Sequence, residues 1–165
     1  MGEFQFLNGK NEELMKAVLI RRATESDHLM IVDFNCRLAE ETEAKQLERD
    51  IVTDGVLSGL EQPDDVQYWL AEVDGETVGQ LMLTREWSDW RNGWIVWLQS
   101  VYVSAPHRRS GVFRQLFAHV RDACRSDPSV VGLRLYVEQE NDRAVQTYQA
   151  LGFRDAGYRV LEDLF

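Results

Sequence analysis

The stretch WIVWLQSVYVSAPHRRSGVFRQL, residues 94–116, decides how the rest of this chain is interpreted. Its first part is rich in aromatic and β-branched side chains, which favour a pleated, half-buried strand. Pro106 cannot donate to a ladder, so it marks the end of that strand. From Val112 to Ala123, apolar residues recur every three or four positions, which predicts a helix. The short basic segment His107–Gly111 lies between the two elements.

A strand, a basic turn and a helix in succession can bind an anion such as phosphate. The first turn of a helix has backbone N–H groups without intrahelical partners and carries the positive end of the helix dipole. Gly111 lets the backbone approach a ligand closely, and the guanidinium groups of Arg108 and Arg109 supply charge-assisted hydrogen bonds. We therefore predict a phosphate-binding loop at residues 108–113. The alternative for the two arginines is a solvated turn.

This loop resembles the pyrophosphate loop of the GNAT acyl-CoA-dependent N-acetyltransferases, Arg/Gln-x-x-Gly-x-Gly/Ala, although Phe113 stands where the family has Gly or Ala. A second segment, residues 141–153, resembles the family's Asn-x-x-Ala-x-x-x-Tyr-x-x-x-Gly-Phe, with Tyr148 at the tyrosine position. The resemblance extends from about Val18 to Phe165. It implies acetyl-CoA as cosubstrate and no metal.

The resemblance and the pattern of elements predict an α/β (α+β) fold, the GNAT acyl-CoA N-acyltransferase fold. The expected order is β-α-α-β-β-β-α-β-α-β, with a mostly antiparallel mixed sheet of about six or seven strands and about four helices. The resemblance implies that the fourth strand carries a bulge and splays apart from the fifth. The last strand is expected at residues 157–164. Residues 1–16 are expected to be a leader or a tag remnant, with Met15 as an alternative start, and residues 17–165 a single domain.

Two helices are expected after a first strand at residues 18–23. Thr24 is the predicted N-cap of the first helix, with Asp27 at the capping-box position. The second helix is predicted at about residues 44–60. Apolar residues at helical spacing are expected on the buried faces: Leu29, Val32, Cys36 and Ala39 in the first helix, and Leu47, Ile51 and Val56 in the second.

Further strands are predicted from turn signals. Asp74-Gly75 predicts a two-residue hairpin between strands at residues 67–73 and 77–85. Gly79 is a predicted bulge or close-approach position. A fifth strand is expected at residues 133–137, after the helix that follows the loop.

Composition excludes several classes of protein. A hydrophobic content of 44% with 28% charged residues is ordinary for a globular domain. No apolar run approaches the length of about eighteen residues that spans a bilayer, and residues 1–16 lack a signal-peptide pattern. Cys36 and Cys124 are expected to be reduced core thiols, as in a cytoplasmic protein. The net charge of −10 argues against nucleic-acid binding and is compatible with a cationic substrate.

The transfer of an acetyl group from a thioester to an amine requires stabilisation of an oxyanion and a proton for the leaving thiolate. The resemblance implies that the pantetheine arm pairs with the strand edge as a peptide would. It also implies that the backbone N–H of Val101 polarises the thioester carbonyl. The predicted cofactor-binding residues are Val101, Tyr102, Val103, Arg108, Arg109, Ser110, Gly111, Val112, Phe113, Asn141 and Tyr148.

Tyr148 is implied to donate the proton to the thiolate. A phenol with a pKa of about 10 is protonated at neutral pH. The alternative is that Tyr148 packs its helix on the sheet. Asn141 is expected to bind the pantetheine or the acyl region, and its alternative is an N-cap role.

The general base is not evident. Many GNAT members carry Glu on the fourth strand at the position of Gln99, whose amide cannot accept a proton at neutral pH. Gln99 is expected to orient a water molecule or the substrate. The amine either loses its proton through water to a carboxylate or enters neutral. The carboxylates considered are Glu40, Glu43, Glu86 and Asp89.

Tryptophans and carboxylates suit an ammonium group through cation–π and ionic contacts. The predicted substrate contacts are Glu40, Glu43, Glu86, Trp87, Trp90 and Gln99. The alternative is that the tryptophans belong to the core or to a homodimer interface, and that the carboxylates are solvated.

The sequence is compatible with three functions. The first is an acetyl-CoA-dependent N-acetyltransferase that acts on a primary amine of a small molecule, polyamine-like or amino-acid-like, by direct transfer in a ternary complex. The second has a protein or peptide amine as acceptor. The third is a non-catalytic acyl-CoA-binding or interaction module.

Overall fold

The structure of the chain is a computed structural model that describes residues 17–138 and 141–165. Its internal contacts separate a first compact unit, which ends at Arg134, from a second, Leu135–Phe165. The expectation of a leader or tag at residues 1–16 lies outside the described residues.

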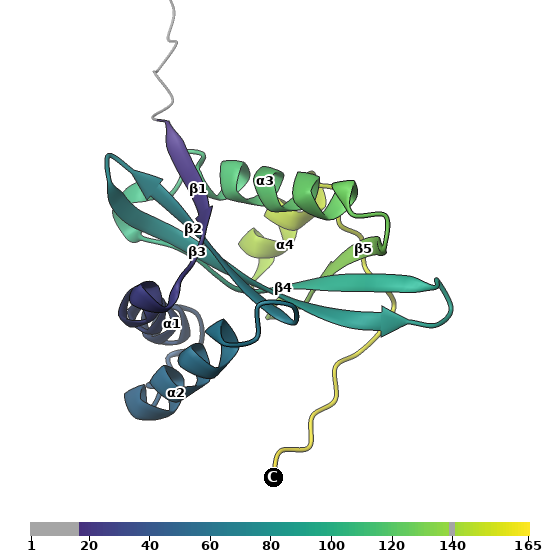
Figure 1. Cartoon of the computed structure of the whole chain (residues 1–165), viewed down its shortest axis with the longest axis horizontal. Coiled ribbons are helices and arrows are strands. Elements are labelled where there is room, and N and C mark those ends of the chain that lie inside the picture. The colour runs from purple at the N-terminus through teal and green to yellow at the C-terminus, as the bar shows by residue number, and fades with distance from the viewer. Residues whose placement is uncertain (1–16, 139–140) are drawn as a thin grey trace, which may run out of the picture. The chain divides into compact units, whose positions relative to one another are not determined.

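The first unit is built on a sheet of five strands in the order β1-β2-β3-β4-β5 (Figure 1). Strands β1 to β4 pair antiparallel, as predicted, and β5 runs parallel to β4. The strands are β1 (Val18–Arg22), β2 (Val66–Val73), β3 (Glu76–Ser88), β4 (Gly93–Val103) and β5 (Val130–Leu135). A parallel pair needs a crossover connection, which α3 (Val112–Ser126) provides.

Helices cover both faces of this sheet. The helices α1 (His28–Glu43) and α2 (Arg49–Leu60) pack on one face, and α3 packs on the other (Figure 1). Successive side chains of a strand point to opposite faces. Every second residue of β2 therefore meets α1 and α2.

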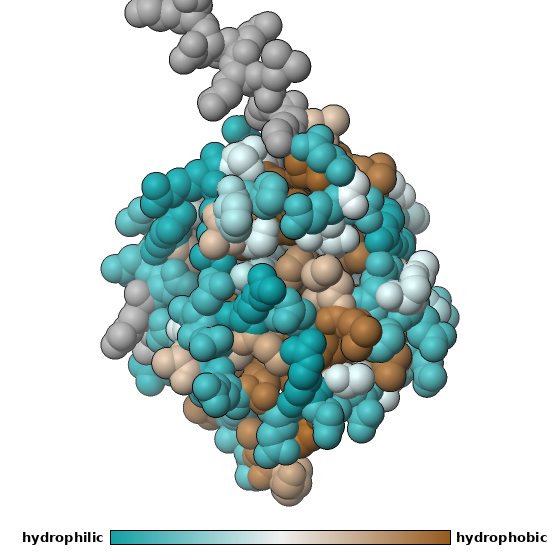
Figure 2. All heavy atoms as spheres, turned by 90° about the vertical axis from the view of Figure 1, so that its left-hand side faces the viewer, coloured by the Kyte–Doolittle hydropathy of each residue, from teal (hydrophilic) through white to brown (hydrophobic). Residues whose placement is uncertain are grey.

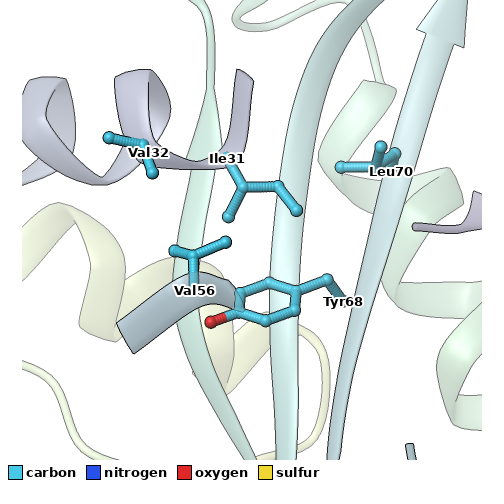
Figure 3. Close-up of a cluster of buried hydrophobic side chains, with 5 residues drawn as sticks. All are labelled: Ile31, Val32, Val56, Tyr68 and Leu70. Carbon is cyan, nitrogen blue, oxygen red and sulfur yellow. The ribbon is translucent and has the colours of Figure 1, made fainter. Parts of the chain in front are cut away.

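A cluster of buried side chains joins α1 and α2 to β2. Figure 3 shows Ile31 and Val32 of α1, Val56 of α2, and Tyr68 and Leu70 of β2. Ile31, Val32 and Leu70 are fully buried. Burying one such aliphatic side chain stabilises the fold by about 1.5–3 kcal/mol. The cluster is therefore a main anchor of the two helices on the sheet.

Helix α3 has the amphipathic pattern that the sequence predicts. Val112, Leu116 and Val120 are buried against the sheet, together with Phe117. Ala123, predicted on the same face, is exposed and lines a cavity on this side of the sheet. Figure 2 shows one face of the molecule, which is largely hydrophilic with apolar residues between the polar ones.

The capping box before α1 is confirmed. Residues Glu25–Asp27 form a short 3-10 turn, and the Thr24 N–H donates to the Asp27 carboxylate at 2.8 Å. Arg21 binds both oxygens of that carboxylate at 2.8 Å. These hydrogen bonds from Arg21 outweigh burial and lower the pKa of Asp27 to about 2. The box therefore also ties β1 to the start of α1.

Three glycines lie where the chain turns tightly or where two strands approach closely. Asp74 and Gly75 have φ angles of 54° and 82°, as a type I′ turn requires, so the predicted hairpin is confirmed. A Cβ atom on Gly79 would lie 3.1 Å from the Tyr102 carbonyl oxygen, which confirms a close approach there. A Cβ atom on Gly93 would lie 2.4 Å from Cγ1 of Val131, so only glycine lets β5 lie this close to β4.

The predicted helix faces are partly wrong. Leu29 is 60% exposed, whereas Phe34 is buried. Residues 29–32 are four consecutive apolar residues, so several helical registers fit the sequence, and packing against the sheet selects one. In α2, Ile51 is 67% exposed and Leu47 lies before the helix begins, while Val56 is buried as predicted. The second helix begins at Arg49 rather than at about residue 44, where the chain leaves α1 with a φ of 52°.

The predicted strand at residues 157–164 is wrong. These residues form no strand, so the described sheet has five strands rather than six or seven. Tyr158, Val160 and Leu161 are all more than two-thirds exposed. The apolar alternation breaks where Leu161 follows Val160, and a strand without a paired edge has no ladder to stabilise it.

The second unit contains α4 (Asp142–Ala150). Asn141 is its N-cap, because its Oδ1 accepts the Ala144 N–H at 3.1 Å. Gly152 ends the helix with a φ of 96°, as is common for a glycine after a helix.

The cysteines and the absence of a membrane-spanning helix among the described residues agree with the sequence. Cys36 and Cys124 are free thiols and half-buried. Among residues 17–138 and 141–165, no helix has the length and apolar character needed to cross a membrane.

Candidate active site

Strand β4 carries a bulge next to Val101. Met82 of β3 lies opposite Gln99, but Gln80, two residues earlier, lies opposite Tyr102, three residues later. Strand β4 therefore has one extra residue in this interval. Ser100 takes up the difference with a φ of 48°, in the left-handed region. The resemblance implied a bulge in the fourth strand, and the structure has one.

The bulge changes which side chains face α1. Gln99 and Tyr102 lie on the same face of the sheet although they are three positions apart, because each lies opposite an even-numbered residue of β3. The Tyr102 ring contacts that of Phe34 in α1, with centroids 5.1 Å apart. Val101, beside the extra residue, lies at the point where the regular ladder is interrupted.

The predicted phosphate loop joins β4 to α3. A 3-10 turn at Ala105–His107 leads into the loop, where Arg109 and Gly111 have φ angles of 64° and 85°. The first intrahelical hydrogen bond runs from the Gln115 N–H to the Gly111 carbonyl at 3.0 Å. The N–H groups of residues 112–114 precede that bond, so they are the donors that a helix start presents to an anion.

Phe113 does not obstruct this loop. Its ring lies beside that of Phe117, one turn further along α3, with centroids 6.0 Å apart. The departure from the family pattern at this position therefore places an aromatic ring along the helix, and the loop keeps its backbone donors.

Arg108 is held by protein groups in this structure. Its Nε donates to the Val103 carbonyl at 2.8 Å, and its terminal nitrogen is hydrogen bonded to the carboxylate of Glu41 in α1. Its guanidinium carbon lies 5.4 Å from the centre of the Tyr102 ring. Arg108 therefore links the loop to α1, while Arg109 is exposed to solvent.

Glu41 of α1 is hydrogen bonded to both Arg108 and Tyr102. It accepts a hydrogen bond from the Tyr102 hydroxyl at 2.9 Å. Burial raises the pKa of Glu41, but the hydrogen bonds from Arg108 and Tyr102 outweigh it, and the net shift of the pKa is downward. Burial and the neighbouring carboxylate raise the pKa of Tyr102. The sequence shows Glu41 in an acidic cluster with Glu40 and Glu43, but it did not predict the pairing of Glu41 with Arg108, which lies 67 positions away.

Polar side chains of β3 and β4 lie on the same face of the sheet as Gln99. The Gln99 amide donates to the Thr84 hydroxyl at 2.7 Å. Glu86 accepts from the Trp97 indole at 2.7 Å and pairs with Arg134 at 3.1 Å. Glu86, predicted as a base or a substrate contact, is thus already engaged in an ion pair.

The tryptophans of the β3–β4 hairpin are divided between the two faces of the sheet. Trp87 and Trp94 lie opposite each other, with ring centroids 5.1 Å apart and on the α3 side. Trp97 lies on the α1 side with Glu86. Trp90 lies in the turn and is 85% exposed. Adjacent residues of a strand point to opposite faces, so the side chains of Glu86 and Trp87 lie on different faces of the sheet.

Two of the predicted substrate carboxylates are distant from the tryptophans along β4. Glu40 and Glu43 are exposed at the end of α1, and Glu43 binds Lys45 at 2.5 Å. This end of α1 contacts the loop after residue 103 through Glu41. The hairpin tip lies near residue 94, about 30 Å away along an extended strand. The structure therefore does not bring these carboxylates together with Trp87 and Trp90.

Tyr148 lies in the second unit. Its ring packs edge-on against that of Phe153, with centroids 5.8 Å apart, and burial raises the pKa of its hydroxyl. The N-cap alternative for Asn141 is confirmed by its bond to Ala144, and an N-cap can still present its remaining groups to a ligand.

A cavity of about 290 Å³ lies elsewhere, on the α3 face of the sheet. Trp69, Trp94 and Cys124 are among the residues that line it. Cys124 lies twelve residues from the start of α3, about 18 Å from the loop along the helix. None of the predicted cofactor-binding residues lines this cavity, so its position is separate from that of the loop.

The α+β arrangement of a mixed five-stranded sheet, a parallel β4/β5 pair and four helices is the GNAT fold. The model of the Acetyltransferase (GNAT) family matches residues 28–153. The chain therefore belongs to the GNAT acetyltransferase family, whose members are N-acetyltransferases that depend on acetyl-CoA. No curated protein matches the sequence.

Solved structures agree with this membership. A possible acetyltransferase from Clostridium difficile 630 is 42% identical, with a TM-score of 0.84, over 90% of this chain and 97% of that one. A predicted acetyltransferase with acetyl-CoA from Clostridium acetobutylicum is 13% identical, with a TM-score of 0.73, over 89% and 96%. AAC(6')-Iy, in complex with a bisubstrate analogue, is 18% identical, with a TM-score of 0.70, over 90% and 99%. The last two similarities concern the fold.

Proposed function

We propose that this protein transfers the acetyl group of acetyl-CoA directly to a primary amine of a small molecule, in a ternary complex. The observation that carries the proposal is the bulge at Ser100, directly before Val101 in the strand that leads into the family's loop. An amide N–H that does not join the ladder is available to a ligand. The Val101 N–H is the donor proposed for the thioester carbonyl.

The residues between the bulge and α3 fit an acyl-CoA. The edge at residues 101–103 would pair with the amides of the pantetheine arm. The loop from Ser110 to Phe113 would hold the pyrophosphate on its N–H groups. Arg109 is exposed and would supply positive charge directly, whereas Arg108 first has to share its guanidinium with Glu41. When bound, acetyl-CoA supplies the activated acetyl group.

Tyr148 is proposed as the proton donor to the coenzyme thiolate, with Asn141 as a ligand of the pantetheine. Burial raises the pKa of Tyr148, so its phenol remains protonated throughout the neutral range. Gln99 is bound to Thr84 and cannot act as a base, and Glu86 is paired with Arg134. We therefore propose that the amine enters in its neutral form or loses its proton through water.

The acidity of the chain supports a cationic acceptor. The net charge of −10 attracts amines that are protonated in solution, and Glu40 and Glu43 add exposed carboxylates at the end of α1. These features favour a polyamine-like or amino-acid-like molecule. The competing acceptor is a protein or peptide amine.

The test is release of free CoA from acetyl-CoA in the presence of polyamines, amino acids, aminoglycosides and a peptide with a free N-terminus. Turnover with a small amine, reduced by about a hundredfold or more in Tyr148→Phe, is expected of a general acid. Turnover with the peptide alone would replace the small-molecule acceptor by a protein. Binding of acetyl-CoA in calorimetry without turnover of any amine would favour a non-catalytic module.

A further inference from the structure

Gln80 is a polar residue in the interior of the first unit, at the centre of β3. Its side chain is fully buried. Its amide nitrogen donates to Oδ1 of Asn35 in α1 at 2.7 Å and to the Ser100 carbonyl at 3.3 Å. Its Oε1 is buried with no hydrogen-bond partner among the described residues. A buried amide with an unpartnered oxygen is unfavourable, so its retention in a core needs a specific reason.

The reason lies in what Gln80 touches. Ser100 is the residue that takes a φ of 48° where β4 gains its extra residue. A non-glycine residue in this region persists only where the surrounding structure holds it. The ladder cannot do so at the bulge, because the extra residue has no partner on β3. The bond from the Gln80 amide to the Ser100 carbonyl takes the place of the missing ladder bond.

Asn35 fixes the direction of this amide. Oδ1 of Asn35 and the Ser100 carbonyl are both acceptors. The –NH₂ group of Gln80 can donate to both, because its nitrogen carries two N–H bonds. Gln80 must therefore turn its nitrogen towards both and its oxygen away from them. A carboxylate has no donor and an aliphatic side chain has no polar atom, so neither could replace it.

We propose that Gln80 is a positioning residue for acyl transfer, whose amide ties the Ser100 carbonyl to α1 and thereby sets the Val101 N–H at the thioester carbonyl. This inference rests on the proposed function. Ser100 and Val101 share one peptide plane, because the carbonyl of Ser100 and the N–H of Val101 belong to the same amide group. Both groups lie in that plane and point in opposite directions, so fixing the Ser100 oxygen also fixes the direction of the Val101 N–H.

The test uses Gln80→Met, which keeps an unbranched side chain of similar length and removes both donors. Two quantities are measured on the full chain: kcat and KM with the best amine of the panel, and the ¹³C chemical shift of the carbonyl of bound [1-¹³C]acetyl-CoA. The shift reports polarisation of the carbonyl and needs no acceptor. Calorimetry gives the affinity for acetyl-CoA separately.

We expect kcat to fall by about tenfold or more, since loss of an oxyanion donor lowers rates on that scale or beyond. The affinity for acetyl-CoA should stay within about threefold, because the loop and strand edge are unchanged. The carbonyl resonance should move from its position in the wild-type complex towards that of free acetyl-CoA. Val56→Ala, which loosens the core cluster away from β4, should lower Tm but leave the resonance in place.

Gln80→Glu separates positioning from simple packing. A protonated carboxyl group can donate to the Ser100 carbonyl and a carboxylate cannot. The resonance in this variant should therefore approach the wild-type position as the pH falls, while that of the wild type stays constant. Asn35→Ala removes one of the two anchors and should produce a smaller displacement in the same direction, which keeps the test available if Gln80→Met does not fold.

Wild-type kcat and an unchanged carbonyl resonance in Gln80→Met would overturn the inference and leave the proposed function intact. Unchanged resonances in Gln80→Glu at high pH and in Asn35→Ala would overturn it equally. A wild-type complex whose carbonyl resonance equals that of free acetyl-CoA would overturn the role of the Val101 N–H and the inference with it. Failure of the wild type to bind acetyl-CoA would overturn the proposed function as well.

Discussion

Glu41→Gln should strengthen the binding of acetyl-CoA. The carboxylate of Glu41 holds the guanidinium of Arg108, which the loop would otherwise offer to a pyrophosphate. The pKa of Glu41 lies below its usual value, so the carboxylate is charged at neutral pH and also repels the phosphates. The amide of glutamine keeps an acceptor for the Tyr102 hydroxyl but removes the charge.

The magnitude follows from the exposure of the pair. The side chains of Arg108 and Glu41 are 37% and 39% exposed, so water screens their interaction. Such pairs contribute about 0.2–1 kcal/mol, which corresponds to an affinity gain of at most about fivefold. The measurement is calorimetric titration with acetyl-CoA at low and physiological ionic strength, with a smaller gain expected at the higher salt concentration.

Glu40→Gln is the matched control. It makes the same change of charge one position earlier in α1, at an exposed residue that does not hold Arg108. Its effect on the affinity should be smaller than that of Glu41→Gln. Weaker binding in Glu41→Gln, or an equal gain in both variants, would refute the idea that Glu41 competes with the pyrophosphate for Arg108.

Three other perturbations have defined outcomes. Gly93→Ala should lower the free energy of unfolding by about 1–3 kcal/mol in denaturant titrations, because its Cβ would overlap β5, whereas Gly55→Ala, in an open helical position, should raise it by about 0.5–1 kcal/mol. The pKa of Asp27 is about 2 in the folded protein, below its value in the unfolded chain. Its bond to Arg21 should therefore add about 1–2 kcal/mol to the free energy of unfolding above pH 4, and this contribution is lost as the pH falls towards 2. Asp27→Asn should remove this pH dependence of Tm. Gln99→Glu should raise kcat/KM below the pKa of the acceptor amine, where a base is useful, and an unchanged pH–rate profile would argue against a role of this position in deprotonation.

Local signals in the sequence predicted the parts of the fold that depend on near neighbours. The capping box at Thr24 and Asp27, the turn at Asp74-Gly75 and the amphipathic pattern of α3 each lie within a few residues, and each is confirmed. The faces of α1 and α2 were less predictable, because consecutive apolar residues such as Leu29 allow several registers until tertiary packing selects one.

The site depended on contacts that lie far apart in the sequence. The contacts of Glu41 with Arg108 and of Gln80 with Asn35 were not predicted, because these partners are 67 and 45 positions apart in the sequence. The family resemblance implied a bulge in the fourth strand, but no glycine marks its position, and the pairing of β4 with β3 places it at Ser100. Two of the predicted substrate contacts, Glu86 and Trp87, are neighbours on β3, and their side chains therefore point to opposite faces of the sheet.

The alternation along β3 and β4 also determines how this site could change through mutation. The side chains of Thr84 and Glu86 share one face with that of Gln99, while those of Arg85 and Trp87 belong to the opposite face. A saturation scan of these strands should therefore give a signal with a period of two, in which one set of positions alters acceptor preference and the other alters α3 packing. Beyond Ser100 the two sets exchange parity, so a library for altered specificity would draw on odd positions of β4 before the bulge and even positions after it.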